Sequence, residues 1–219
     1  MIKDLISEIT SFIKGKTIDA LIPSITFVSV NSFFGLTIGI FVSMSISIII
    51  LLVRWLRKED VRYGSVGLIM LIIASFLTIL TNNPNTYFLP DLITNFLIII
   101  GIIITLFMNK PFAAYASHLT RSWPLEWYWR NDIKPAYFEV SIIWGLFFSF
   151  KLLIQIFNLL NSNLNNPFVN ILLGFPFTLF VMSLSYLYGI KRLKNLKGPS
   201  VEEFRIKANK PYKGQTKGF

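Results

Sequence analysis

Residues 21–53 read LIPSITFVSVNSFFGLTIGIFVSMSISIIILLV, and this stretch decides the fold because no charged side chain interrupts it. As one helix, its 33 residues would be about 50 Å long, whereas the hydrocarbon core of a bilayer is roughly 30 Å thick. Asn31 and Gly35 interrupt the apolar run and favour a break in the helix. The stretch therefore predicts two consecutive membrane-spanning helices, at about 20–32 and 35–53.

The rest of the chain has the same character. Hydrophobic residues make up 53% of it and charged residues 15%, whereas about a quarter of a typical soluble domain is charged. Further apolar blocks at about 63–80, 92–108, 137–157 and 168–190 are long enough to cross a bilayer. We therefore predict an all-α fold, a polytopic membrane bundle with six transmembrane helices within residues 18–190.

The positions of lysine and arginine predict the orientation. They flank the first pair of spans, fill the loop after the fourth span and crowd the tail 191–219, whereas residues 81–86 and 158–167 contain none. Basic loops remain on the cytoplasmic side. Both termini are thus predicted to be cytoplasmic, in the inner membrane of a prokaryote, and Lys151 is the exception among the basic residues.

The two ends of the chain are expected to lie outside the bilayer. In residues 1–17, apolar side chains recur at helical spacing opposite charged ones, which predicts an interfacial amphipathic helix. A soluble helix packed on the cytoplasmic loops is the alternative. The tail 191–219 has nine basic and two acidic residues together with glycine and proline, so we expect an irregular, disordered segment that attracts anionic lipids.

Lys151 predicts a candidate polar site inside the membrane. An ammonium group within a span costs about 2.5–3.5 kcal/mol on insertion scales, so it needs a partner or water. Gln155 lies one helical turn further along the same face, and Asp91, Asn95 and Asn31 are predicted at the same outer half of the bundle. A Lys151–Asp91 ion pair follows, either structural or part of a ligand or ion pathway. Alternatively, Lys151 extends to the outer headgroups while Asp91 caps a helix.

Small residues recur every four positions in the second and fifth predicted spans. Such stripes let helix backbones approach closely, so we expect helix packing there, with a pore lining as the alternative. The residues are Gly35, Gly39, Ser43, Ser47, Ser141, Gly145 and Ser149.

Tryptophans gather in the predicted cytoplasmic loop between the fourth and fifth spans. Trp123, Trp127 and Trp129 stand beside Arg121 and Arg130. Aromatic residues of this kind commonly sit at the headgroup level, so they are predicted to be interfacial anchors, with partner binding as the alternative.

Several classes of function have no support in the sequence. The chain has no cysteine and one histidine, His118, so we expect no metal site and no cofactor. No nucleophile or phosphate-binding glycine loop accompanies the acidic residues, so no catalytic residue is assigned and an enzyme is not expected. The charge of +10 is explained by membrane-flanking residues, and no nucleic acid is expected as a partner. The expected partners are the lipid bilayer, anionic lipids, and a second copy or another membrane protein.

Short motifs along the chain resemble a bacterial membrane family catalogued as domain of unknown function 3159. The resemblance covers roughly residues 20–190, and in that family arginine usually occupies the position of Lys151. The motifs are Leu21-Ile22-Pro23-Ser24, Asn31-Ser32-Phe33-Phe34-Gly35, Arg54-Trp55-Leu56-Arg57-Lys58-Glu59, Tyr87-Phe88-Leu89-Pro90, Asn95, Lys110-Pro111, Trp144-Gly145, and Lys151 with Gln155.

The chain is more distantly similar to the intracellular septation protein A family. The likeness consists of a basic loop after an early span, a Lys-Pro that closes a later one, and a span containing Trp144-Gly145. That resemblance implies a role in the cell envelope without a catalytic site. The leading hypothesis is therefore a non-enzymatic envelope or membrane-organisation protein, and the alternative is a small channel or transporter with an outward-facing polar pocket.

Overall fold

The computed structural model describes residues 16–59, 61–160 and 167–219. It is 79% helical, and the described residues contain no strand, which confirms the all-α class. The predicted amphipathic helix at 1–17 falls almost entirely outside the described residues. The chain divides into two compact units: unit 1 contains Asn95–Lys151 and Leu179–Phe219, and unit 2 contains residues 16–94 and Leu152–Thr178.

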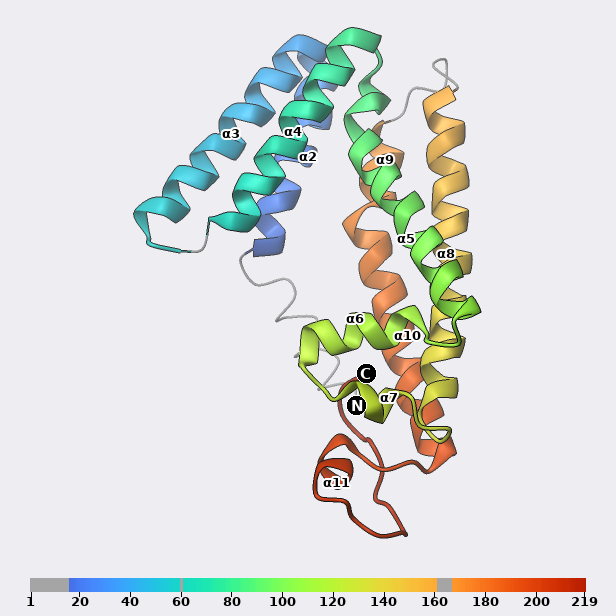
Figure 1. Cartoon of the computed structure of the whole chain (residues 1–219). Coiled ribbons are helices and arrows are strands. Elements are labelled where there is room, and N and C mark those ends of the chain that lie inside the picture. Colours follow the sequence, from blue (N-terminus) through green and yellow to red (C-terminus); the bar gives the residue numbers. More distant parts are fainter. Residues whose placement is uncertain (1–15, 60, 161–166) are drawn as a thin grey trace. The chain divides into compact units, whose positions relative to one another are not determined.

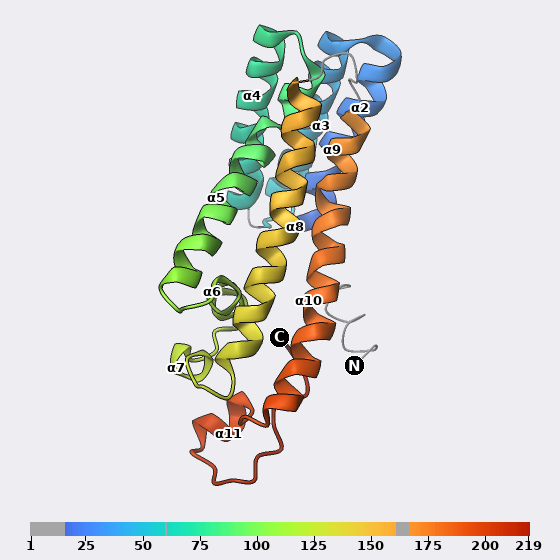
Figure 2. The same cartoon turned by 90° about the vertical axis from the view of Figure 1, so that its right-hand side faces the viewer.

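Unit 2 begins with a helical hairpin. Helix α2 (Lys16–Phe34) is followed directly by α3 (Leu36–Leu56), with Gly35 between them at a φ of +83°, a conformation that glycine adopts without steric cost. Helix α4 (Arg62–Thr81) lies beside α3, and η1 (Pro84–Phe88) follows it. Figures 1 and 2 both show α2, α3 and α4 together.

The centre of unit 2 is apolar. The ring of Phe27 stacks on that of Tyr87 with centroids 3.9 Å apart, and Ile40 and Ala74 pack into the same buried cluster. The short helix α9 (Pro167–Leu173) contacts both α2 and η1. The unit therefore joins segments from the first and last thirds of the chain.

Unit 1 is built around two long helices. Helices α8 (Lys134–Leu160) and α10 (Phe175–Leu196) run side by side in opposite directions (Figure 2). The indole of Trp144 donates a 2.6 Å hydrogen bond to Ser185, and Arg192 lies 2.8 Å from the carboxylate of Glu139. Helix α5 (Leu89–Phe107) also contributes to this unit from Asn95 onward, and α6 (Phe112–Arg121) and α7 (Leu125–Tyr128) follow it.

One predicted span is interrupted. Residues 168–190 are predicted as one helix, but the structure breaks it at Gly174, between α9 and α10. Pro176 accounts for the break, because proline has no N–H to continue the hydrogen-bond ladder and its ring crowds the preceding turn.

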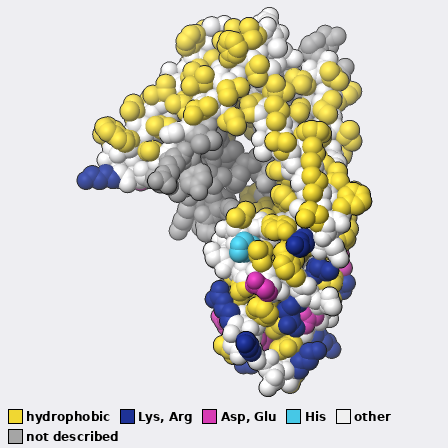
Figure 3. Space-filling model, in the orientation of Figure 1, with side chains coloured by type: hydrophobic (Ala, Val, Ile, Leu, Met, Phe, Trp, Pro, Cys, Tyr) yellow, Lys and Arg dark blue, Asp and Glu magenta, His cyan; other side chains and the backbone are white. Residues whose placement is uncertain are grey.

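Four helical segments are long and apolar enough to cross a membrane: Leu36–Leu56, Pro84–Phe107, Lys134–Leu160 and Phe168–Leu196. Two shorter apolar segments, Ile22–Phe34 and Leu68–Thr81, accompany them. Large apolar side chains cover their outer faces (Figure 3), as expected where lipid replaces water. These features are those of a membrane protein, while the count of six spans and the orientation stay predictions.

Candidate functional site

The tail is folded, which contradicts the expectation of a disordered segment. Helix α10 continues to Leu196, α11 covers Val201–Arg205, and Val201, Phe204 and Phe219 pack into an apolar cluster with the segment after α5. We call residues 109–137 together with 193–219 the loop–tail module. Its order comes from contacts between distant residues, which the local composition of the tail does not reveal.

An aromatic core organises this module. Trp127, Tyr128 and Tyr137 are fully buried, and their rings meet edge to face, with centroids 5.0 Å apart for Trp127–Tyr128 and 4.9 Å for Tyr128–Tyr137. Such geometry is favourable because the positive edge of one ring meets the negative face of the next. The Tyr128 hydroxyl donates to Ser117 at 3.0 Å, and burial raises the pKa of Tyr128. The core therefore links α6, α7 and the start of α8.

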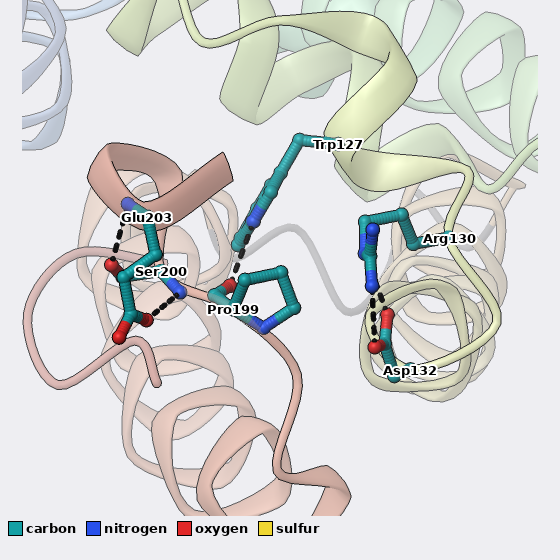
Figure 4. A network of polar contacts seen from close by, with 6 residues as sticks. All are labelled: Trp127, Arg130, Asp132, Pro199, Ser200 and Glu203. Atoms are coloured by element: carbon teal, nitrogen blue, oxygen red, sulfur yellow. Dashed lines mark hydrogen bonds and ion pairs between the residues drawn. The ribbon is translucent and has the colours of Figure 1, made fainter. Parts of the chain in front are cut away.

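Hydrogen bonds fasten the tail to this core, as Figure 4 shows. The Trp127 indole donates to the Pro199 carbonyl at 2.9 Å, which connects residues 72 positions apart. Ser200 and Glu203 form a reciprocal capping box at the start of α11. On the loop side, Arg130 binds Asp132 through two 2.8 Å hydrogen bonds. The guanidinium also lies 5.9 Å from the centroids of two tail rings, Phe204 and Tyr212.

Glu203 is the polar centre of the tail. Its carboxylate accepts hydrogen bonds from three backbone N–H groups: Ser200 at 2.8 Å, Lys213 at 2.7 Å and Gly214 at 3.1 Å. These bonds favour the charged form, that from Ser200 most strongly, and lower the pKa of Glu203 to about 2. The carboxylate therefore stays ionised at any physiological pH.

One of the three predicted interfacial anchors is fully buried in the structure. Trp127 is enclosed on all sides by protein, so its ring has no surface to offer to headgroups. Trp123 and Trp129 are half-buried and pack against the same core. The anchor prediction is therefore wrong for Trp127, which contacts Pro199 of the tail, and stays a prediction for Trp123 and Trp129.

In unit 2, two of the predicted polar residues meet. The Gln155 side chain donates a 2.7 Å hydrogen bond to the Asp91 carboxylate, and Gln155 is buried. Asn31, by contrast, packs against α3, where a Cβ atom on Gly39 would lie 3.1 Å from the Asn31 backbone nitrogen. Within this unit, the residues of the predicted polar site therefore do not form one group.

Lys151 and Asn95 belong to unit 1. Lys151 is 3% exposed, so protein encloses its side chain, and it does not lie along a lipid-facing surface. The Asn95 amide donates to the Phe148 carbonyl at 3.1 Å. Asn95 thereby ties α5 to α8 just before Lys151 in the chain.

A cluster of asparagines in unit 2 was not predicted from the sequence. Asn85 donates to the Asn158 carbonyl at 2.8 Å and accepts from the side chain of Asn170 at 3.2 Å. Beside it is a recess with room for about one water molecule, lined by Asn85, Phe88, Leu89, Leu92, Gln155, Leu159 and Asn170. The available signal was that Asn158 continues the face of α8 that carries Lys151 and Gln155.

The small-residue stripes have mixed roles. Gly39 and Ser43 are buried between helices, and Ser141 accepts a 3.0 Å hydrogen bond from the Ala113 backbone. A Cβ on Gly145 would lie 3.5 Å from Ile102. Gly35 has open space around its Cβ position and provides the break between helices, while the half-buried Ser47 and Ser149 lie at the edges of the stripes.

Among the described residues, no group of three His, Cys, Asp or Glu side chains is placed to hold a metal ion. Comparisons with curated proteins and with solved structures found no match to this chain. A family model described as "Protein of unknown function (DUF3159)" matches residues 14–195, which is most of the chain. With its apolar helices and this match, the chain belongs to the DUF3159 family.

Proposed function

We propose that this protein is a non-enzymatic membrane-organisation or envelope protein, with its loop–tail module as the part that contacts partners. The folded module carries the proposal: an aromatic core closed by backbone hydrogen bonds adjoins the basic ends of α8 and α10. A polypeptide region ordered in this way offers a fixed surface to a partner. The more distant resemblance to the intracellular septation protein A family suggests the envelope context, in a prokaryotic inner membrane.

Exposed basic side chains suit this role. Lys197, Arg205, Lys207, Lys210 and Lys213 are all exposed on the tail, and charged side chains gather at that end of unit 1 (Figure 3). Basic residues close to an anionic membrane surface contribute roughly 1 kcal/mol each. Anionic lipids, another membrane protein or a second copy of the chain are the proposed partners.

The polar contacts in unit 2 fit a structural role better than a solute path. Asn85, Asn158 and Asn170 bond to one another, Gln155 bonds to Asp91, and the adjoining recess has room for about one water molecule. In a membrane, polar side chains that bond across helices hold the bundle together. We infer that this cluster stabilises the packing of η1, α8 and α9 against one another.

A photocrosslinking experiment tests the proposal. A photoreactive residue at Lys207, on the module, is compared in cells with one at Leu97, an exposed apolar position on α5. Adducts of defined mass at position 207, weakened when Lys210 and Lys213 become glutamine, support partner contact through the module. Identical adducts at both positions, unaffected by the charge changes, reject it.

Lys151 favours a second candidate, a small channel or transporter. A buried ammonium within a candidate span is costly to keep and often marks an ion or substrate pathway. This alternative predicts solute flux in proteoliposomes that Lys151→Met removes while helix content stays unchanged. Absence of flux in the wild type across inorganic ions and small metabolites, or flux that survives Lys151→Met, counts against Lys151 as the pathway.

A further inference from the structure

The segment Lys213–Phe219 crosses the ends of two helices and inserts an aromatic ring there. The Phe219 ring stacks on Tyr137, at the start of α8, with centroids 4.3 Å apart and planes 6° apart. On α10, a Cβ atom at Gly189 would overlap the Phe219 ring. The ring thus occupies a slot with Tyr137 as one wall and the bare backbone of Gly189 as another.

The backbone beside this ring is also held. Gly218 has a φ of +76°, and a Cβ on it would lie 2.9 Å from both the Arg121 guanidinium and the Trp123 ring. Arg121 donates to the backbone oxygen of Phe219 at 3.1 Å, and Gly218 donates to the Tyr186 hydroxyl at 3.4 Å. One short segment therefore contacts α6, α8 and α10 together.

A second set of contacts holds the beginning of the segment. Gln215 is buried, accepts a 3.1 Å hydrogen bond from the Val201 backbone and donates to the Lys217 carbonyl. The Glu203 carboxylate binds the backbone of Lys213 and Gly214. These contacts stay within the tail, whereas those of Gly218 and Phe219 reach the helices.

We propose that Lys213–Phe219 is a strap that clamps the basic ends of α8 and α10, with Phe219 as its latch. The strap has no helix or strand, and Lys213, Thr216 and Lys217 are exposed along it, so it belongs to the part of a fold that opens first. Polar contacts between α8 and α10 near this ring are Glu139–Arg192, Glu139–Tyr188 and Trp144–Ser185. Release of Phe219 therefore vacates the Tyr137–Gly189 slot and leaves the ends of α8 and α10 joined by the contacts of Glu139, so their separation should vary more widely.

A distance measurement on the full chain tests the clamp. The chain has no cysteine, so Asn131→Cys and Asn195→Cys, both at exposed positions, place spin labels near the ends of α8 and α10. Phe219→Ala is expected to broaden the distance distribution, and Thr216→Ala, an exposed position on the same strap, to leave it unchanged. Hydrogen exchange of residues 213–219 reports independently whether the strap has been released. A distribution that stays narrow although exchange accelerates would overturn the proposal.

Rescue by a peptide separates release of the strap from misfolding. A synthetic peptide with the sequence of residues 213–219 is added to the Phe219→Ala protein and is expected to restore the narrow distribution. The same peptide with alanine for phenylalanine should bind roughly 10-fold or more weakly, because burial of the aromatic ring is lost. Gly189→Val in the Phe219→Ala background should block rescue. Equal rescue by both peptides, or rescue that survives Gly189→Val, would contradict binding of the Phe219 ring between Tyr137 and Gly189.

Discussion

Replacement of Trp127 by phenylalanine should release the tail from the loop–tail module. Trp127 is fully buried, and its indole N–H donates to the carbonyl of Pro199, which is also buried. A buried carbonyl left without its donor costs about 1–3 kcal/mol, and the smaller ring leaves a cavity that adds roughly 1 kcal/mol. The expected destabilisation of the tail is therefore about 2–4 kcal/mol.

Hydrogen exchange mass spectrometry in detergent micelles measures this effect locally. A loss of about 2–4 kcal/mol corresponds to roughly 30- to 1000-fold faster exchange through local opening in residues 199–206. Trp55→Phe is the matched control, because Trp55 is 65% exposed at the end of α3 and should change stability by less than about 0.5 kcal/mol. If the two variants exchange alike in residues 199–206, the Trp127–Pro199 bond does not hold the tail.

Two further predictions follow from the polar contacts. Asn85→Ala should lower the free energy of unfolding of unit 2 by about 1–3 kcal/mol, because it removes the hydrogen-bond partner of Asn158 and Asn170. Asn195→Ala, at an exposed position, is the control. Equal melting temperatures for the two variants would contradict the assignment. The pKa of Glu203 is about 2 in the folded tail and 4.5 in its ordinary state, so its carboxylate stabilises the folded tail fully above pH 4.5. Protection of the tail's backbone amides against hydrogen exchange should therefore fall as the pH drops from 4.5 towards 2. Glu203→Gln should remove that pH dependence of exchange, and a slope that persists in the variant would assign it to another group.

The helical segments could be predicted because a bilayer imposes a length on each apolar block. A break within residues 21–53 followed from this limit, since the stretch is too long for one helix, and Asn31 and Gly35 indicated its position. The break at Gly174 was missed, although Pro176 was its signal. A proline two residues after a glycine interrupts a helix even where the surrounding residues stay apolar.

The tail and the asparagine cluster could not be predicted because their contacts join distant parts of the chain. Trp127 meets Pro199 across 72 positions, and Asn85 meets Asn170 across 85. Asn85 lies in residues 81–86, which the sequence marked only as a segment without basic residues between two predicted spans. For Gln155, by contrast, the shared helical face with Lys151 was visible in the sequence, and the side chain does meet Asp91.

The carboxylate of Glu203 closes a loop in the chain. By binding Lys213 and Gly214, it joins points about ten residues apart, and such a closure reduces the entropy that the tail can gain by opening. Many small, irregular protein regions achieve this with a disulfide, but this chain has no cysteine. The hydrogen bonds of Glu203 are instead insensitive to reductants and are weakened when its carboxylate is protonated. The fold of the tail therefore does not depend on the redox state of its surroundings.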